Sequence, residues 1–457
     1  MSGDLYSART VPPGAAAILA LIVAALAFGA AIAQLPWLTL VAVLALSVCA
    51  FGAFGLGSEA LILTLLVLVP LVPATDAGVV AGIGSQGLAV RAPIIGLLLL
   101  AAMAVYFGGV PRPARDSVAR LVISLLMLAA VGAATAIVNA QTATQTLSEL
   151  AHAAGQPLVY ALALLVFGAY AVHGKAAQER LLIAFCLGIV LQAGFVAVEL
   201  ASGAAFDAVR GFTRAQGTVG SNFLSALGML GVFAALALRE RASDALARRF
   251  SDLALVCGAG ILAAGISRGA VIALMVGFAY LLFRSRRLRV GPLLAGLAVS
   301  AVVVVVLGSF WEQRLQTGIT EFDRTSTWVA GLRIAGDNPV TGLGSDGVVE
   351  AIETRPDYAV TPYGTTTVIP HNIWILGFAE SGVVYLLAMV ALTVVAISSV
   401  RSRPRPRAPG DGPLVAALVG FGVLCAINNM FGHPELVLGV LMMLALLLVP
   451  TGRVEPG

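Results

Sequence analysis

The chain has 457 residues, of which 59% are hydrophobic and only 11% are charged, and its mean hydropathy is +0.98. Soluble domains usually carry about 25% charged residues, so this composition excludes a soluble globular protein and indicates an integral membrane protein. The net charge of +4 says little by itself, and we expect no nucleic-acid partner.

Apolar runs long enough to cross a bilayer recur along the whole chain. A transmembrane helix needs about 17 to 25 residues, and the chain is therefore predicted to be an all-α polytopic membrane helical bundle with about 12–14 transmembrane helices. The four cysteines all fall inside apolar runs, so neither a disulfide framework nor a metal site is expected. The predicted spans lie at about 14–34, 36–56, 59–73, 93–109, 117–138, 155–173, 180–201, 219–238, 252–266, 269–284, 291–309, 371–399, 413–430 and 434–450.

The positions of the basic residues predict the orientation of these spans. If the N-terminus is cytoplasmic, 19 of the 27 Lys and Arg residues fall in inside segments, as the positive-inside rule requires. The long polar stretch from Phe310 to Pro370 is then external. Eight arginines are external against this bias, so each needs a local reason: Arg91, Arg210, Arg214, Arg268, Arg314, Arg324, Arg333 and Arg355.

This map divides the chain into four parts. Residues 1–204 form N-terminal transmembrane helices, and residues 205–309 form central transmembrane helices with external arginine motifs. Residues 310–370 form a large external loop domain with short helices, and residues 371–457 form the C-terminal transmembrane helices.

The first external arginines lie in a Gly-rich segment that leads into a span. Arg210 and Arg214 are followed by Gly217, Gly220 and a Ser or Asn suited to capping a helix. Backbone N–H groups in such a stretch can cradle a phosphate while guanidinium groups bind it bidentately. Alone, this pattern is a weak signal for a phosphate site.

Arg268 lies in a very short turn between two predicted spans. Ser267 is suited to cap the second span, and Gly269 allows close backbone approach. A helix N-terminus beside an arginine favours an anion. The alternative is an arginine that extends to the external headgroups.

The external stretch contains a short helical pattern that begins near Arg324 and stops at Asp337-Asn338-Pro339, followed by a turn at Gly342-Leu-Gly344. An arginine near a helix start is unfavourable for the helix dipole, so a nearby anion is the better reason for Arg324.

His371 and Asn372 stand at the mouth of the next span, where a histidine with a pKa near 6.5 suits a general base. A structural histidine at a loop-to-helix junction is the alternative. Glu380 lies nine residues along the same span, deep in the bilayer if the helix is regular. Such a carboxylate is either paired structurally or functional.

No external loop contains an Asp-x-Asp pair or an acidic cluster. A divalent metal that holds a diphosphate needs oxygen ligands, so metal-dependent transfer is disfavoured and no cofactor is expected. Arginines would then have to neutralise an anionic leaving group.

Four motif groups together give the chain a family resemblance over about residues 205–385. It resembles the O-antigen ligase and O-antigen polymerase superfamily of bacterial membrane glycosyltransferases. The matching residues are Arg214-Ala-Gln-Gly217 with Ser221-Asn222; Ser267-Arg268-Gly269; Arg324-Thr-Ser-Thr-Trp328 with Asn338-Pro339 and Gly342-Leu-Gly344; and His371-Asn372 with Glu380-Ser-Gly382.

The resemblance implies a type C glycosyltransferase-like fold in the bacterial inner membrane, with the active site facing the periplasm or outside. The implied reaction transfers a glycan from an undecaprenyl-diphosphate carrier to an acceptor hydroxyl, without metal and with inversion. Arg214, Arg268 and Arg324 would bind the diphosphate, with Arg210 as a further contact. His371 would be the base, supported by Ser267, Asn372 and Glu380.

Several functions stay open at this stage. The enzyme can be a ligase acting on lipid A core in lipopolysaccharide biosynthesis, or a polymerase acting on a glycan chain. A non-enzymatic transporter or flippase of lipid-linked glycans would carry charged residues spread through the spans, whereas these arginines are all external. A structural scaffold would tolerate replacement of the external arginines.

Overall fold

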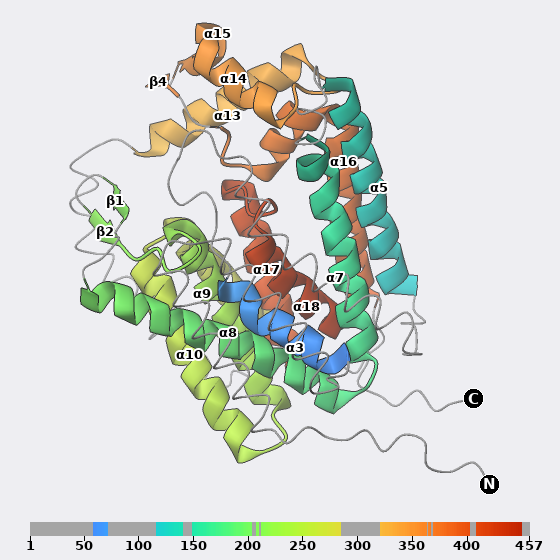
Figure 1. Ribbon diagram of the computed structural model, residues 1–457, viewed down its shortest axis with the longest axis vertical. Coiled ribbons are helices and arrows are strands. Elements are labelled where there is room, and N and C mark those ends of the chain that lie inside the picture. The colour runs from blue at the N-terminus through green and yellow to red at the C-terminus, as the bar shows by residue number, and fades with distance from the viewer. Residues whose placement is uncertain are drawn as a thin grey trace, which may run out of the picture.

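The computed structural model describes residues 58–71, 116–139, 149–202, 207–209, 212–284, 320–362, 364–366, 369–402 and 408–449. The predicted spans at 14–34, 36–56, 93–109 and 291–309, and residues 310–319 of the external stretch, lie outside these residues. The described chain is an all-α membrane protein with two small β-hairpins (Figure 1).

The α-helices are, in chain order, α3 (Ser58–Leu68), α5 (Asp116–Asn139), α7 (Gln156–Ala171), α8 (Lys175–Ser202), α9 (Ser221–Arg241), α10 (Ala245–Gly265), α11 (Arg268–Arg284), α13 (Thr320–Asp337), α14 (Ser345–Thr354), α15 (Pro356–Ala359), α16 (Ile373–Arg401), α17 (Asp411–Ile427) and α18 (Pro434–Leu448). A 3-10 turn (Val69–Leu71) continues α3, and a π turn (Ala151–Gly155) precedes α7. Strands β1 (Asp207–Val209) and β2 (Phe212–Arg214) form one antiparallel hairpin, and β3 (Val360–Thr361) and β4 (Gly364–Thr365) form the other.

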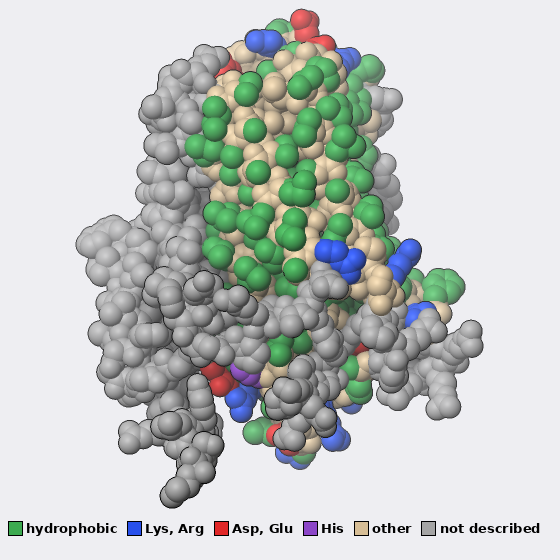
Figure 2. Space-filling model, turned by 90° about the vertical axis from the view of Figure 1, so that its right-hand side faces the viewer, with side chains coloured by type: hydrophobic (Ala, Val, Ile, Leu, Met, Phe, Trp, Pro, Cys, Tyr) green, Lys and Arg blue, Asp and Glu red, His purple; other side chains and the backbone are tan. Residues whose placement is uncertain are grey.

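Five of the described helices are long and apolar enough to cross a membrane, namely α5, α7 with its preceding turn, α8, α9 and α16. The face that contains α5 and α16 carries exposed hydrophobic side chains such as Met127, Ile137, Leu387 and Val394. Figure 2 shows hydrophobic side chains over the middle of this face, with Lys, Arg, Asp and Glu gathered toward its two ends. This distribution suits contact with lipid along the middle of the bundle.

Helix α9 is the buried centre of the bundle and packs closely on α10. A Cβ at Gly228 of α9 would lie 2.7 Å from the carbonyl oxygen of Gly258 in α10, so small residues let these two helices approach, as is usual in membranes. Helix α11 packs instead against α17. The turn between α10 and α11 is as short as predicted, because only two residues separate these helices. Beyond the turn the two helices diverge, and α10 packs on α9 while α11 packs on α17.

Helix ends that the charge pattern predicts to lie on the same side of the membrane are in contact with one another. On the predicted external side, Asn139 Nδ2 donates to the carbonyl of Thr341 at 2.9 Å, and Ala215 N donates to the carbonyl of Ala264 at 3.1 Å. On the predicted internal side, Arg241 Nη2 donates to Asp411 Oδ1 at 2.8 Å, and both side chains are buried.

Helices α13, α14 and α15 with β3 and β4 form a cap over one end of the bundle (Figure 1). The cap has its own small core, in which Ile334, Val348 and Tyr358 pack with Leu376 and Ala379 of α16. The long polar stretch therefore folds against the first turns of α16. As predicted, α13 ends at Asp337, where Asn338 and Pro339 follow.

Candidate active site

Arg268 is the first residue of α11 and is separated from the end of α10 only by Ile266 and Ser267. Ile266 has a φ of 46°, a left-handed conformation that is uncommon for a β-branched residue. The turn is held against α9, because Ser267 is buried and its backbone N–H donates to Ser225 Oγ at 3.2 Å. Arg268 thus lies at a fixed helix N-terminus, where backbone N–H groups have no partner within the helix.

Arg324 lies in the second turn of α13, and His371 lies just before α16. Helix α13 packs closely against this junction, because a Cβ at Gly331 of α13 would overlap the ring of Pro370. Helix α13 is therefore fixed across the start of α16, and both Arg324 and His371 are half-buried there.

Arg268, Arg324 and His371 are electrostatic neighbours although they come from three separate segments. Burial, and then the positive charge of Arg324, lowers the pKa of His371 below its usual value. Burial, and then the positive charge of Arg268, lowers the pKa of Arg324. Two arginines that repel each other in a partly buried place favour an anion between them, and a histidine beside them stays neutral and able to accept a proton.

Arg214 is the last residue of strand β2. The next residue, Ala215, donates its backbone N–H to the carbonyl of Ala264, four residues before Arg268. The predicted phosphate cradle is wrong in one respect. The backbone N–H groups of Gln216 and Gly217 donate to the two carboxylate oxygens of Glu199, at 2.9 and 2.8 Å, so an internal carboxylate occupies the position predicted for a phosphate. Arg210 lies outside the described residues.

The expected cap of α9 also differs from the structure. The N-cap residue is Gly220, with a φ of 83° and no side-chain hydrogen bond, rather than Ser221 or Asn222. The glycines of this segment therefore serve the local backbone path.

Asn372 has a structural task. Its side-chain oxygen accepts from the backbone N–H groups of Trp374 and Ile375 at 2.9 and 3.2 Å, and its Nδ2 donates to the carbonyl of Ala426 at 2.8 Å. It caps α16 and ties this helix to the end of α17, which fixes the backbone beside His371.

The sequence predicted that Glu380 lies deep in one regular span. The structure differs, because α16 breaks at Gly382 (φ 76°, ψ −176°), two residues after Glu380. The loop after α13 enters this break. Leu343 N donates to the carbonyl of Ala379 at 2.9 Å, and Gly344 N donates to the carbonyl of Glu380 at 2.8 Å. Glu380 therefore lies at the level of the cap.

Glycines on both sides make this docking possible. Gly342 and Gly382 have positive φ angles, and a Cβ on either would overlap the backbone of the other segment. Val383 N completes the contact by donating to the carbonyl of Pro339 at 2.8 Å. The motifs around Gly342 and Gly382 thus attach the cap to α16.

Three buried N–H donors at the arginine motifs were not predicted from the sequence. Among the described residues, Gln192 Nε2, Trp328 Nε1 and Asn428 Nδ2 are buried without a hydrogen-bond partner. Gln192 lies against Gly217, and Asn428 lies against Gly269. Such groups cost free energy unless a ligand satisfies them. For Gln192 and Asn428, the signal in the sequence is a polar amide within or at the end of an apolar run; the indole of Trp328 has no such signal.

Comparison with protein families gives one match. Residues 253–390 match a family model described as O-antigen ligase. The matched residues extend from α10 into α16 and include Arg268, Arg324 and His371, whereas Arg210 and Arg214 precede them. No curated protein matches the chain.

Proposed function

We propose that this chain, whose residues 253–390 match the O-antigen ligase family model, transfers a glycan from an undecaprenyl-diphosphate carrier to an acceptor hydroxyl. The proposed site faces the periplasm from the bacterial inner membrane. Lipid A core is the proposed acceptor, which makes the chain a ligase in lipopolysaccharide biosynthesis.

The grouping of Arg268, Arg324 and His371 is the observation that carries this proposal. A glycosyl diphosphate already has a good leaving group, so the enzyme must stabilise its negative charge, orient the acceptor and remove a proton. Two arginines and a neutral histidine supply the first and third of these. No metal is needed in this scheme, because the guanidinium groups neutralise the diphosphate.

The proposed reaction is a single displacement. The acceptor oxygen attacks the anomeric carbon and forms the new glycosidic bond while the bond from that carbon to the phosphate oxygen breaks. His371 accepts the hydroxyl proton, and undecaprenyl diphosphate leaves with the bonding electrons beside Arg268 and Arg324. Attack opposite the leaving group inverts the configuration of the sugar carbon. Arg214 and Arg210 are proposed as further diphosphate contacts.

The test is transfer by purified protein in proteoliposomes with a lipid-linked glycan donor. Arg268→Ala and His371→Ala should each lower transfer by at least about 100-fold, since removal of one transition-state contact costs that much. Arg355→Ala is the matched control, because Arg355 is exposed and lies over the ring of Tyr358 in the cap. Unchanged transfer in both site variants would overturn the proposal.

The same assay separates the alternatives. With lipid A core as acceptor, mass analysis of the product identifies a ligase, whereas elongation of a glycan chain identifies a polymerase. Movement of the donor across proteoliposomes that contain no acceptor, without any transfer, would identify a transporter.

A further inference from the structure

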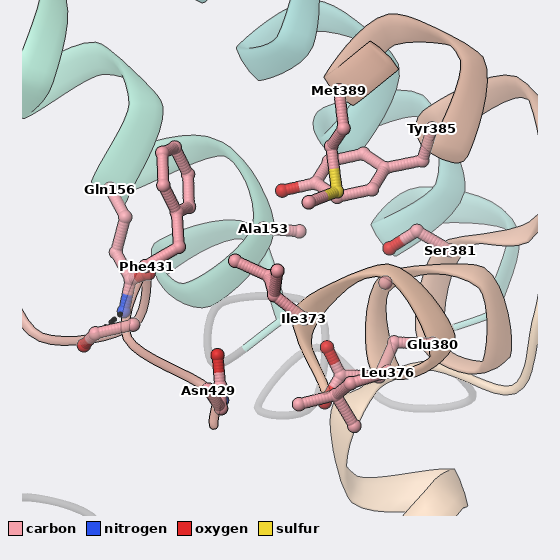
Figure 3. A pocket seen from close by; sticks show the side chains of 12 residues that line it. Ala153, Gln156, Ile373, Leu376, Glu380, Ser381, Tyr385, Met389, Asn429 and Phe431 are labelled. Atoms are coloured by element: carbon pink, nitrogen blue, oxygen red, sulfur yellow. Dashed lines mark hydrogen bonds between the residues drawn. The ribbon is translucent and has the colours of Figure 1, made fainter. Parts of the chain in front are cut away.

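The cavity in Figure 3 is too small for a sugar ring. It lies between α16, the start of α7 and the turn from α17 to α18, and its volume is about 30 Å³, which is room for about two water molecules. Hydrogen-bond donors without a partner are a better indication of a ligand, because a buried N–H without an acceptor costs free energy until an acceptor arrives. One such donor lies beside the loop that follows Arg214.

Two successive backbone N–H groups of this loop already bind an anion. The N–H groups of Gln216 and Gly217 donate to the two carboxylate oxygens of Glu199. Gly217 has a φ of 54°, and successive N–H groups in such a turn form a concave anion-binding site. The carboxylate therefore occupies a cradle whose backbone geometry also suits a phosphate.

Gln192 places a third donor at this cradle. Its side chain is fully buried, its Oε1 accepts from the hydroxyl of Thr218 at 3.0 Å, and its Nε2 packs against Gly217. Among the described residues no acceptor bonds to this Nε2, so the carboxylate of Glu199 leaves it unused. A phosphate has more oxygen atoms than a carboxylate and can satisfy all three donors.

Glu199 is held less firmly than a buried structural carboxylate. It lies at a half-buried position in the last turn of α8. In the part of the chain that the structure describes, its carboxylate accepts from the two backbone N–H groups and pairs with no Lys or Arg. Asp411, in contrast, is buried and paired with Arg241. Rotation about the bonds of the Glu199 side chain can therefore free the cradle without movement of a helix.

The loop adjoins the proposed diphosphate site. Ala215 N donates to the carbonyl of Ala264 at 3.1 Å, and Arg268 begins α11 four residues after Ala264. Ser225 of α9, the helix that follows the loop, accepts from the backbone N–H of Ser267. A diphosphate bound at Arg268 would therefore lie next to the cradle, and one of its phosphates would compete with Glu199.

We propose that Glu199 is a gate of the donor site. Its carboxylate fills the cradle of Gln216 and Gly217 while the site is empty, and a phosphate of the incoming polyprenyl diphosphate displaces it and also accepts from Gln192 Nε2. The inference rests on the proposed function. Because part of the binding free energy is used to displace the carboxylate, the apparent affinity for the donor is lower than that of an open cradle.

The test measures two constants in the proteoliposome assay: the donor KM, and the inhibition constant of undecaprenyl diphosphate, which has the phosphates but no glycan. Glu199→Gln removes the competing charge, so both constants should fall by about 5- to 20-fold, while the acceptor KM stays within about twofold. Glu179→Gln is the matched control, because Glu179 also belongs to α8 and accepts from the backbone N–H of Ser243 at 3.1 Å, near the opposite end of the helix. It should leave both constants unchanged.

Gln192→Met tests the unused donor. Loss of its Nε2 should raise both constants by about 5- to 20-fold, the effect of losing one ligand hydrogen bond. Thr218→Val is its control, because it removes the hydrogen bond between Thr218 and Gln192 Oε1 and keeps the Nε2. This variant should leave both constants within about twofold.

The direction of the change separates a gate from a structural contact. If Glu199 only fixes the loop, Glu199→Gln loosens the cradle, and both constants rise. A rise or no change, with normal wild-type transfer, overturns the gate and leaves the proposed function standing. No transfer by the wild type with any acceptor contradicts the proposed function and the gate with it. If Glu199→Gln does not accumulate in the membrane, Gln192→Met decides, and unchanged constants in that variant overturn the gate.

Discussion

Arg324 of the cap lies close enough to His371 that its positive charge, added to the effect of burial, lowers the pKa of the imidazole below the ordinary value of 6.5. The histidine is therefore neutral at pH 7 and ready to accept a proton. Because the arginine comes from the cap and the histidine from the mouth of α16, this relationship depends on how the cap is attached. The cap thus carries the charge that lowers the pKa of His371, and in the proposed reaction the same arginine would also neutralise the diphosphate.

The pH dependence of transfer should show the effect of Arg324 on the pKa of His371. Protonation of His371 at low pH removes the base, so kcat/KM of the wild type should fall only below pH 6.5. Arg324→Gln removes the repelling charge, which raises the pKa of His371 and moves the acid limb to higher pH, on top of a loss of about 100-fold in rate. Arg324→Lys keeps the charge and should keep the limb in place. An identical limb in wild type and Arg324→Gln would contradict the coupling.

The attachment of the cap gives a second prediction. A side chain at Gly382 is strained by its φ of 76° and would overlap the carbonyl oxygen of Val340. Gly382→Ala should lower the free energy of unfolding by about 1–3 kcal/mol and reduce transfer at least about tenfold, because Arg324 is no longer held beside His371. Thermal unfolding in detergent and the transfer rate measure the two effects.

Gly336→Ala is the control for this substitution. Gly336 is an exposed position of α13, and a Cβ added there would have no atom within 4 Å, so alanine should stabilise the helix by up to about 1 kcal/mol and leave transfer unchanged. Equal behaviour of the two variants would show that the break at Gly382 does not hold the cap.

Local signals predicted several helix ends correctly, whereas contacts between distant segments were not predictable. The end of α13 at Asp337 follows from Asn338 and Pro339, whose effect is local. The break of α16 at Gly382 depends on a loop about forty residues earlier in the chain, and an isolated glycine in an apolar run is ordinary in membrane helices. For this reason the sequence placed Glu380 in a regular span.

The same distinction applies to the candidate site. The excess of basic residues on one side predicted which face carries Arg268, Arg324 and His371, but charge patterns contain no distances, so only the structure brings these groups together. A Gly-rich segment with arginines also predicts a phosphate cradle. Glu199, which belongs to another helix, takes up the N–H groups of Gln216 and Gly217 instead, and no feature of that segment indicates it.

A third prediction concerns the buried pair at the other end of the bundle. Arg241 and Asp411 are each 2% exposed at their side chains, and Arg241 also donates to Gln178 Oε1 at 2.8 Å. Arg241→Met leaves a buried carboxylate unpaired, so the free energy of unfolding should fall by about 3–5 kcal/mol. The double variant Arg241→Met/Asp411→Leu should be more stable than the single variant, as thermal unfolding in detergent will measure.

The exposed pair of Arg239 and Asp252 is the matched control, since its side chains are 57% and 50% exposed. Arg239→Met should change the free energy of unfolding by no more than about 1 kcal/mol, because solvent screens the pair. A loss as large as that of Arg241→Met would show that burial is not what makes the inner pair important.

The last prediction concerns Asn428, whose replacement should weaken donor binding without lowering the stability of the protein. Its Nδ2 is buried against Gly269 without a hydrogen-bond partner among the described residues. If it donates to a diphosphate oxygen beside Arg268, Asn428→Leu should raise the donor KM by about 5- to 20-fold, while the protein without donor becomes equally or more stable. Asn338→Leu is the control, because Asn338 Nδ2 already donates to the carbonyl of Ile334 at 3.2 Å, so its replacement should cost some stability and leave the donor KM unchanged. A stabilised Asn428→Leu protein with an unaltered donor KM would exclude Asn428 from the diphosphate site.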